Sequence, residues 1–186
     1  MHFHTDTSWT RQVEAVDLAL LTRFNRIEHP VLHRLMIGFT KLGDTSSWVI
    51  LGVTLLVMGG SASLFGQRLA VSALSAAAIA QVLKRIAKRT RPSHAHPTVR
   101  ERCVVPACSS FPSGHTLTAF AVAMAMGGLD SWTGSVGLLF AMGVGCSRVY
   151  LGAHYPGDVT VGAILGSVWG TALLFLGGPV QLIGYL

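Results

Sequence analysis

The segment Phe111-Pro112-Ser113-Gly114-His115 places a histidine at the expected start of a helix. Proline followed by serine is typical of a helix N-terminus. The free backbone N–H groups and the positive end of the helix dipole make such a terminus suitable for an anion. Gly114 would let the backbone approach that anion, with His115 beside it. A capping serine next to a surface histidine is the alternative interpretation.

A second histidine, His154, precedes another expected helix start at Pro156. Asp158 then falls in the first turn, within reach of the imidazole. A carboxylate that accepts a hydrogen bond from one ring nitrogen fixes the tautomer and leaves the other nitrogen free to attack an electrophile. Arg148 adds a planar, permanently charged group suited to phosphate oxygens. A purely structural His–Asp pair is the alternative.

The third group of candidate residues is a basic run that ends at Arg91-Pro92. Lys84 and Arg91 are seven residues apart, two helical turns, so both side chains can point the same way. Pro92 disfavours helical geometry at Arg91, and we expect the helix to fray there and the guanidinium to turn inward. A charged helix end lying against lipid headgroups is the alternative. The other cations nearby are interpreted as a solvated rim: Arg85, Lys88, Arg89, Arg100 and Arg102.

The elements that must position these residues are membrane helices. The 186-residue chain is 51% hydrophobic and 12% charged, with a mean hydropathy of +0.53, whereas a soluble domain carries about 25% charged residues. We predict an all-α integral-membrane helical bundle, because only helices satisfy the backbone within such apolar runs. Five transmembrane helices are expected, each near the roughly 17 to 25 residues that a bilayer requires. They cover residues 46–64, 69–86, 113–129, 132–148 and 158–177.

The first 44 residues are expected to form amphipathic, interfacial helices that precede a catalytic transmembrane domain at 45–186. Within 10–27, apolar residues recur at steps of three and four, which places them on one helix face. These residues are Val13, Val16, Leu20, Phe24 and Ile27. A second short helix is expected at 31–41, and a helix packed on the outside of the bundle is the alternative. The many charges in this region predict no cleavable signal peptide.

The connections also fix the expected location of the site. With alternating spans, segments 87–112 and 148–157 emerge on the same side of the membrane as the N-terminal region. All three candidate groups therefore meet at one face. Gly162, Gly166 and Gly170 share one face of the last helix, which predicts close packing against a neighbouring helix.

The net charge of +6 and a pI near 9.8 indicate an anionic partner. Aromatic residues are few and the cations do not spread over a soluble face, so nucleic acid is not expected. An anionic lipid or phosphate ester, with membrane lipids around it, fits better. Cys103 and Cys108 lack zinc-ligand spacing. We expect no metal and no cofactor; the oligomeric state is left open.

Together the three groups resemble the signatures of the type 2 phosphatidic acid phosphatase (PAP2) superfamily. The matching patterns are Lys-x6-Arg-Pro from Lys84, Pro-Ser-Gly-His from Pro112 and Ser-Arg-x5-His-x3-Asp from Ser147. The resemblance runs from about Lys84 to Asp158 and implies a metal-independent phosphatase. Many bacterial members have six spans, and the N-terminal amphipathic stretch is expected to substitute for the first.

The resemblance also implies roles for individual residues. His154 would be the nucleophile that forms a phosphohistidine, Asp158 its orienting partner and His115 the general acid. The phosphoryl oxygens would be held by three cations, a serine and a backbone amide. These groups belong to Lys84, Arg91, Arg148, Ser113 and Gly114.

The expected function is therefore hydrolysis of a lipid phosphate monoester or pyrophosphate. Candidate substrates are phosphatidic acid, phosphatidylglycerophosphate and undecaprenyl pyrophosphate. Lipid phosphotransfer, or a non-enzymatic lipid carrier or scramblase, are the alternatives; a vanadate-dependent haloperoxidase is disfavoured because those proteins are soluble. The positive-inside rule would put the site in the cytoplasm, whereas the family resemblance implies the extracytoplasmic face of the inner membrane. There Cys103 and Cys108 could form a disulfide or remain two thiols.

Overall fold

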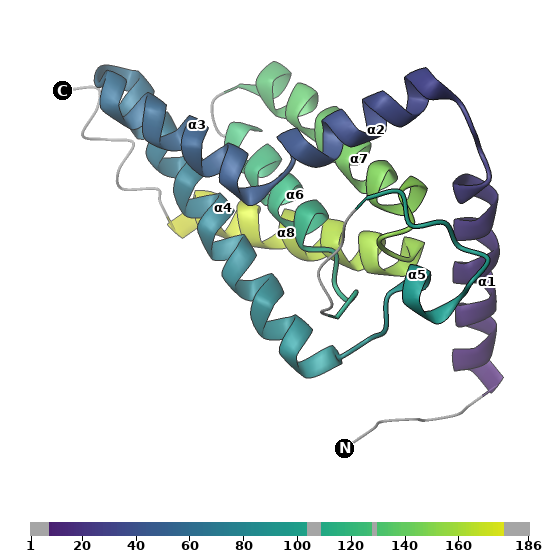
Figure 1. The fold of residues 1–186 in the computed structure, drawn as a ribbon. Coiled ribbons are helices and arrows are strands. Elements are labelled where there is room, and N and C mark those ends of the chain that lie inside the picture. Colours follow the sequence, from purple (N-terminus) through teal and green to yellow (C-terminus); the bar gives the residue numbers. More distant parts are fainter. Residues whose placement is uncertain (1–7, 104–108, 128–129, 177–186) are drawn as a thin grey trace.

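The chain folds into a bundle of α-helices, as predicted, and every regular element in the described residues is helical (Figure 1). The computed structural model describes residues 8–103, 109–127 and 130–176. The helices are α1 (Ser8–Asn25), α2 (Pro30–Leu42), α3 (Thr45–Met58), α4 (Gly60–Ala87), α5 (Pro92–Ala95), α6 (Gly114–Gly127), α7 (Ser131–Tyr150) and α8 (Pro156–Leu176).

Within the described part of the chain, α4 and α8 are each long and apolar enough to cross a bilayer. The pair α2 and α3, bent by 56° where they join, would supply a third span if it crosses as one unit. The expected number of five spans is not confirmed. Helices α3 and α6 contain 14 described residues each, fewer than the roughly 17 that a straight crossing needs, and α7 is less apolar than α8.

The boundary between the first two expected spans was wrong. The apolar run predicted one helix over 46–64, but α3 ends at Met58 and α4 begins at Gly60. Gly59 and Gly60 have φ angles of 76° and 59°, a left-handed conformation that glycine adopts without a steric penalty. The chain therefore reverses inside the apolar run, and α4 is much longer than the expected 69–86.

Helix α6 lies at the centre of the bundle, packed against α8, α7 and α4. The glycine face of α8 allows this contact, as the sequence predicted. A Cβ atom added to Gly162 would lie 2.8 Å from the Ser113 carbonyl oxygen, and one on Gly170 would lie 2.5 Å from that of Ala121. Gly166 sits between them and would clash with the Leu117 carbonyl oxygen. The two backbones thus run in contact over about two helical turns.

Helix α1 lies at the edge of the bundle, against α7 and α8. One face, with Asp17, Leu21 and Asn25, is buried. The predicted apolar stripe is turned away by about 90°, at 100° per residue, and its five side chains are 43% to 59% exposed. The helix is confirmed and it packs outside the bundle; its proposed place in the bilayer interface, like the division at residue 44, stays a prediction.

The expected meeting of the connections is confirmed. Helix α1, the short helix α5, the C-terminal end of α7 and the N-terminal end of α8 gather at one side of the molecule (Figure 1). The Arg91 guanidinium, just before α5, donates a hydrogen bond to the Ala153 carbonyl, between α7 and α8. Segments far apart in the sequence therefore form one surface.

We predict that Gly166→Ala destabilises the bundle, because the new Cβ would collide with the Leu117 carbonyl and force α6 and α8 apart. Overpacking of this kind costs about 1–3 kcal/mol. Thermal unfolding in detergent should show a clearly lower midpoint. Gly38→Ala is the matched control, since nothing lies within 4 Å of its added Cβ. An unchanged midpoint for Gly166→Ala would contradict the close packing.

Candidate active site

His154 and Asp158 form a buried pair at the start of α8. The side chain of His154 is buried and that of Asp158 is completely enclosed. His154 Nδ1 and Asp158 Oδ2 are 3.6 Å apart, slightly longer than a hydrogen bond, and Nδ1 has no closer hydrogen-bond partner among the described residues. The same carboxylate oxygen accepts a hydrogen bond from the Tyr155 backbone N–H at 3.0 Å. The loop between α7 and α8 thus holds imidazole and carboxylate together.

The other ring nitrogen of His154 faces a cation. Arg91 Nη1 lies 3.4 Å from His154 Nε2 and also donates to the Ala153 carbonyl at 3.1 Å. A guanidinium has only donors, so Nε2 carries the lone pair and the proton resides on Nδ1, toward Asp158. This is the tautomer that a nucleophilic Nε2 requires.

Two arginines of the expected set are almost entirely buried at this point. Arg91 is 3% and Arg148 is 4% exposed. Arg148 Nη1 donates to Thr40 Oγ1 of α2 at 3.1 Å, while its buried Nε makes no hydrogen bond within the described residues. Buried charge is costly unless it is paired. A phosphate in this position would supply the missing acceptors.

The N-terminus of α6 brings in a third cation. A Cβ on Gly114 would lie 3.6 Å from Lys84 Nζ, so the ammonium and the first turn of α6 are neighbours. Ser113 is buried, its hydroxyl shares a hydrogen bond with Thr116 at 2.9 Å, and its N–H donates to the Asp158 carbonyl at 3.1 Å. The backbone at the start of α6 is therefore fixed to the start of α8.

His115 belongs to the same cluster, because the positive charges of Arg148 and Lys84 act on it. Its Nε2 lies 3.3 Å from Asp44 Oδ1. Asp44 stands between α2 and α3, far upstream in the sequence. The sequence analysis missed this partner. The available signal was that Asp44 has few other charged residues near it in the sequence.

Sequence reasoning also misassigned Arg89. Its guanidinium pairs with Asp158 Oδ1 at 2.7 Å and with Asp17 Oδ2 at 2.9 Å, and it stacks over the Tyr155 ring at 4.0 Å. The side chain is 27% exposed. The interpretation of Arg89 as a member of a solvated rim was therefore wrong.

A basic cavity of about 300 Å³ opens beside the cluster. Its lining residues are Lys84, Lys88, Arg89, Thr90, Arg91, His94 and Ser109. This concentration of cations around a hollow favours an anionic ligand. The described residues contain no group of three or more His, Cys, Asp or Glu side chains able to hold a metal. The pairing considered for Cys103 involves Cys108, which lies outside the described residues.

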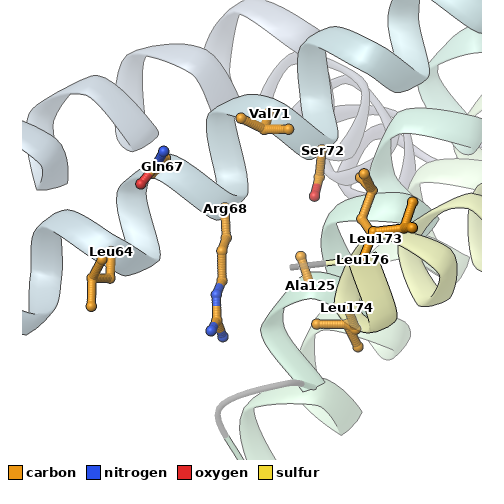
Figure 2. A pocket seen from close by; sticks show the side chains of 9 residues that line it. All are labelled: Leu64, Gln67, Arg68, Val71, Ser72, Ala125, Leu173, Leu174 and Leu176. Carbon is orange, nitrogen blue, oxygen red and sulfur yellow. The ribbon is translucent and has the colours of Figure 1, made fainter. Parts of the chain in front are cut away.

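A second cavity of about 270 Å³ lies elsewhere, between α4, α6 and α8 (Figure 2). Its lining residues are Leu64, Gln67, Arg68, Val71, Ser72, Ala125, Leu173, Leu174 and Leu176. Arg68 extends from α4 into this mostly apolar space (Figure 2). It precedes Lys84 by sixteen residues, about 24 Å along the helix. The candidate site residue Lys84 therefore lies toward the other end of α4.

Comparison with known proteins agrees with this architecture. The sequence profile of the PAP2 superfamily matches residues 65–177, which include all eight candidate site residues. The chain belongs to the PAP2 superfamily.

Among its relatives is an undecaprenyl-diphosphatase of Sulfolobus acidocaldarius, 32% identical over 82% of this chain and 73% of that protein. A decaprenylphosphoryl-5-phosphoribose phosphatase of Mycobacterium tuberculosis is 38% identical over 109 residues. That match covers 59% of each protein, so the chain spans about three fifths of that relative.

Two solved structures are similar throughout most of the chain. LpxE of Aquifex aeolicus has a TM-score of 0.74 and 27% identity, covering 84% of this chain and 93% of that one. A transmembrane PAP2-type phosphatidylglycerolphosphate phosphatase of Bacillus subtilis has a TM-score of 0.67 and 25% identity, covering 91% and 86%. With the apolar helices, these neighbours identify the chain as a membrane protein.

The pKa of His154 provides a test of the site in the resting protein. Burial lowers this pKa from its ordinary 6.5 to about 4, helped by Arg148 and Arg91 and opposed by Asp158. The imidazole is therefore neutral at pH 5 to 8. Because the unfolded chain binds this proton near pH 6.5, the folded state loses stability as the pH falls from 6.5 toward 4.

We expect ¹⁵N-histidine NMR in detergent to show one imidazole titrating near pH 4, assigned by its absence in His154→Asn. A midpoint between 6 and 7 for that imidazole would contradict the buried, cation-flanked environment.

Proposed function

We propose that this protein is a membrane lipid phosphatase that acts through a phosphohistidine on His154. The observation that carries the proposal is the geometry of His154: Nδ1 faces the Asp158 carboxylate and Nε2 faces the buried Arg91 guanidinium. A nucleophilic nitrogen is thereby aimed at the place where an anionic phosphoryl group would be bound.

In the first step, the lone pair on His154 Nε2 attacks phosphorus. A nitrogen–phosphorus bond forms while the bond from phosphorus to the lipid oxygen breaks. His115 donates its proton to that leaving oxygen, so the lipid departs as an alcohol or, from a pyrophosphate, as a monophosphate. Asp158 stabilises the positive charge that develops on the imidazole and keeps its Nδ1 proton in place.

In the second step, water attacks phosphorus and the nitrogen–phosphorus bond breaks. The now neutral His115 accepts the proton of the water, and inorganic phosphate leaves. His154 and His115 are thereby restored. Asp44, 3.3 Å from His115 Nε2, orients the acid, and its negative charge, together with that of a bound phosphate, opposes the burial and the cations that lower the pKa of His115 in the resting protein.

The three cations stabilise the charge on the phosphoryl oxygens in both steps. Arg91 and Arg148 supply planar groups of donors, and Lys84 supplies a point charge beside the Gly114 amide. Ser113 fixes the first turn of α6, whose free N–H groups face the same space. Preorganised donors of this kind cost no reorganisation during the reaction. Neither step requires a metal.

The proposed substrate class is a lipid phosphate monoester or pyrophosphate. The relatives named as an undecaprenyl-diphosphatase and a decaprenylphosphoryl-5-phosphoribose phosphatase support a polyprenyl lipid. The structural neighbour named as a phosphatidylglycerolphosphate phosphatase supports a glycerolipid. We further propose the inner membrane as the location, with the site at the extracytoplasmic face, on the basis of the family resemblance.

The main prediction is that His154→Ala abolishes phosphate release, with a loss on the order of 10³-fold or more, while the protein remains folded in detergent. The assay uses purified protein with phosphatidic acid, phosphatidylglycerophosphate and undecaprenyl pyrophosphate, with EDTA present. Acid-labile phosphate trapped on the wild type, and absent from His154→Ala, would identify the intermediate.

Several results would contradict this proposal. Full activity of His154→Ala excludes that nucleophile, and strong inhibition by EDTA indicates a metal mechanism. Phosphate recovered on a second lipid instead of in solution indicates a transferase. Lipid movement between leaflets without hydrolysis indicates a scramblase.

The role of His115 predicts a dependence on the leaving group. His115→Ala should slow hydrolysis of an alkyl phosphate by about 10²–10⁴-fold, but an aryl phosphate such as p-nitrophenyl phosphate far less, because its leaving group needs no proton. Asp44→Asn should show a weaker form of the same pattern. Equal losses on both substrates would show that His115 does not act as the acid.

A further inference from the structure

The Asp158 carboxylate is connected through Arg89 to a second carboxylate on α1. Arg89 Nη1 donates to Asp158 Oδ1 at 2.7 Å, and Nη2 donates to Asp17 Oδ2 at 2.9 Å. The other oxygen of Asp17 accepts the Gly157 backbone N–H at 2.7 Å. Asp17 thus contacts both the arginine and the first turn of α8, one residue before Asp158.

Each oxygen of Asp158 has a separate task in this arrangement. Oδ2 faces His154 Nδ1 and accepts the Tyr155 N–H, while Oδ1 is occupied by Arg89. Because Asp158 is fully buried, removal of Arg89 would leave Oδ1 without a described partner. An unpaired buried carboxylate oxygen is unfavourable, and rotation of the carboxylate toward another donor would break its alignment with the imidazole.

Arg89 itself is held from three directions. The two carboxylates fix the plane of its guanidinium, and the Tyr155 ring lies 4.0 Å below it. Two carboxylates surround its single positive charge. The buried Nε of Arg148, by contrast, makes no hydrogen bond within the described residues. Arg89 is therefore committed to protein carboxylates, although it also lines the basic cavity.

We infer that Asp17 and Arg89 are positioning residues for the nucleophile: helix α1, through this bridge, holds Asp158 in the orientation that aligns His154. The inference rests on the proposed function, since it assumes His154 as the attacking group. It gives the N-terminal helix a role in the chemistry beyond its contact with the bundle.

The test compares Asp17→Asn, Arg89→Lys and Arg89→Gln with the wild type. We expect kcat to fall about 10- to 100-fold in each, the range measured for partners that orient a functional histidine, with KM changed less than threefold. Lysine keeps the charge but cannot bridge two carboxylates with a planar group. The double variant Asp17→Asn/Arg89→Gln should lose no more than Arg89→Gln alone, because the two residues act in series.

Two controls separate positioning from general loosening of α1. Asn25→Ala removes the hydrogen bonds from α1 to the Arg100 backbone and to the Tyr150 carbonyl but leaves the bridge intact. Arg100→Gln removes an exposed ion pair with Glu28. We expect Asn25→Ala to lower thermal stability with little change in kcat, and Arg100→Gln to change neither. A fall in kcat for Asn25→Ala as large as for Asp17→Asn would overturn the inference.

A second readout needs no activity. ¹⁵N NMR of the resting protein near pH 7 should show His154 with its proton on Nδ1, and this tautomer should lose its dominance in Arg89→Gln and Asp17→Asn. An unchanged tautomer together with an unchanged kcat would overturn the inference. So would a raised KM at constant kcat, which would make Arg89 a substrate ligand. If the wild type hydrolyses no lipid phosphate but the tautomer still depends on Arg89, the proposed function fails and the bridge stands.

Discussion

The site depends on holding several positive charges close together away from water. Arg91 and Arg148 are nearly enclosed, and Arg91 lies 3.4 Å from the neutral imidazole of His154. Such a cluster is unfavourable without acceptors, and the described residues place the Ala153 carbonyl against Arg91 and the Thr40 hydroxyl against Arg148. In the proposed mechanism, the positive charge of this cluster favours a multiply charged anion.

Carboxylates from the N-terminal helices balance this charge without filling the anion position. Asp17 pairs with Arg89, which also pairs with Asp158, and Asp44 pairs with His115. Each proposed catalytic histidine has a carboxylate neighbour of its own, Asp158 for His154 and Asp44 for His115. In the proposed mechanism, Asp17 and Asp44 are paired with Arg89 and His115, so they do not compete with the phosphate for Arg91 and Arg148.

The sequence predicted the helical fold and the segments that meet at the site, because motif spacing and apolar runs are local properties. It did not predict the turn at Gly59, since a Gly-Gly pair within an apolar run is also compatible with a continuous helix. Asp17, Arg89 and Asp44 could not be assigned either. Their partners are 69 to 140 residues away in the chain, and only tertiary packing selects them from the other charges.

The distance between the two histidines is set by helix packing rather than by either motif. His115 begins α6, and His154 directly precedes α8. Gly162, one turn after Asp158, lies against the Ser113 carbonyl, and Ser113 in turn donates to the Asp158 carbonyl. A larger residue at Gly162 would move the start of α6, and with it His115, away from His154. The glycine row that makes the bundle compact thus also fixes the spacing on which the proposed attack and proton transfer would depend.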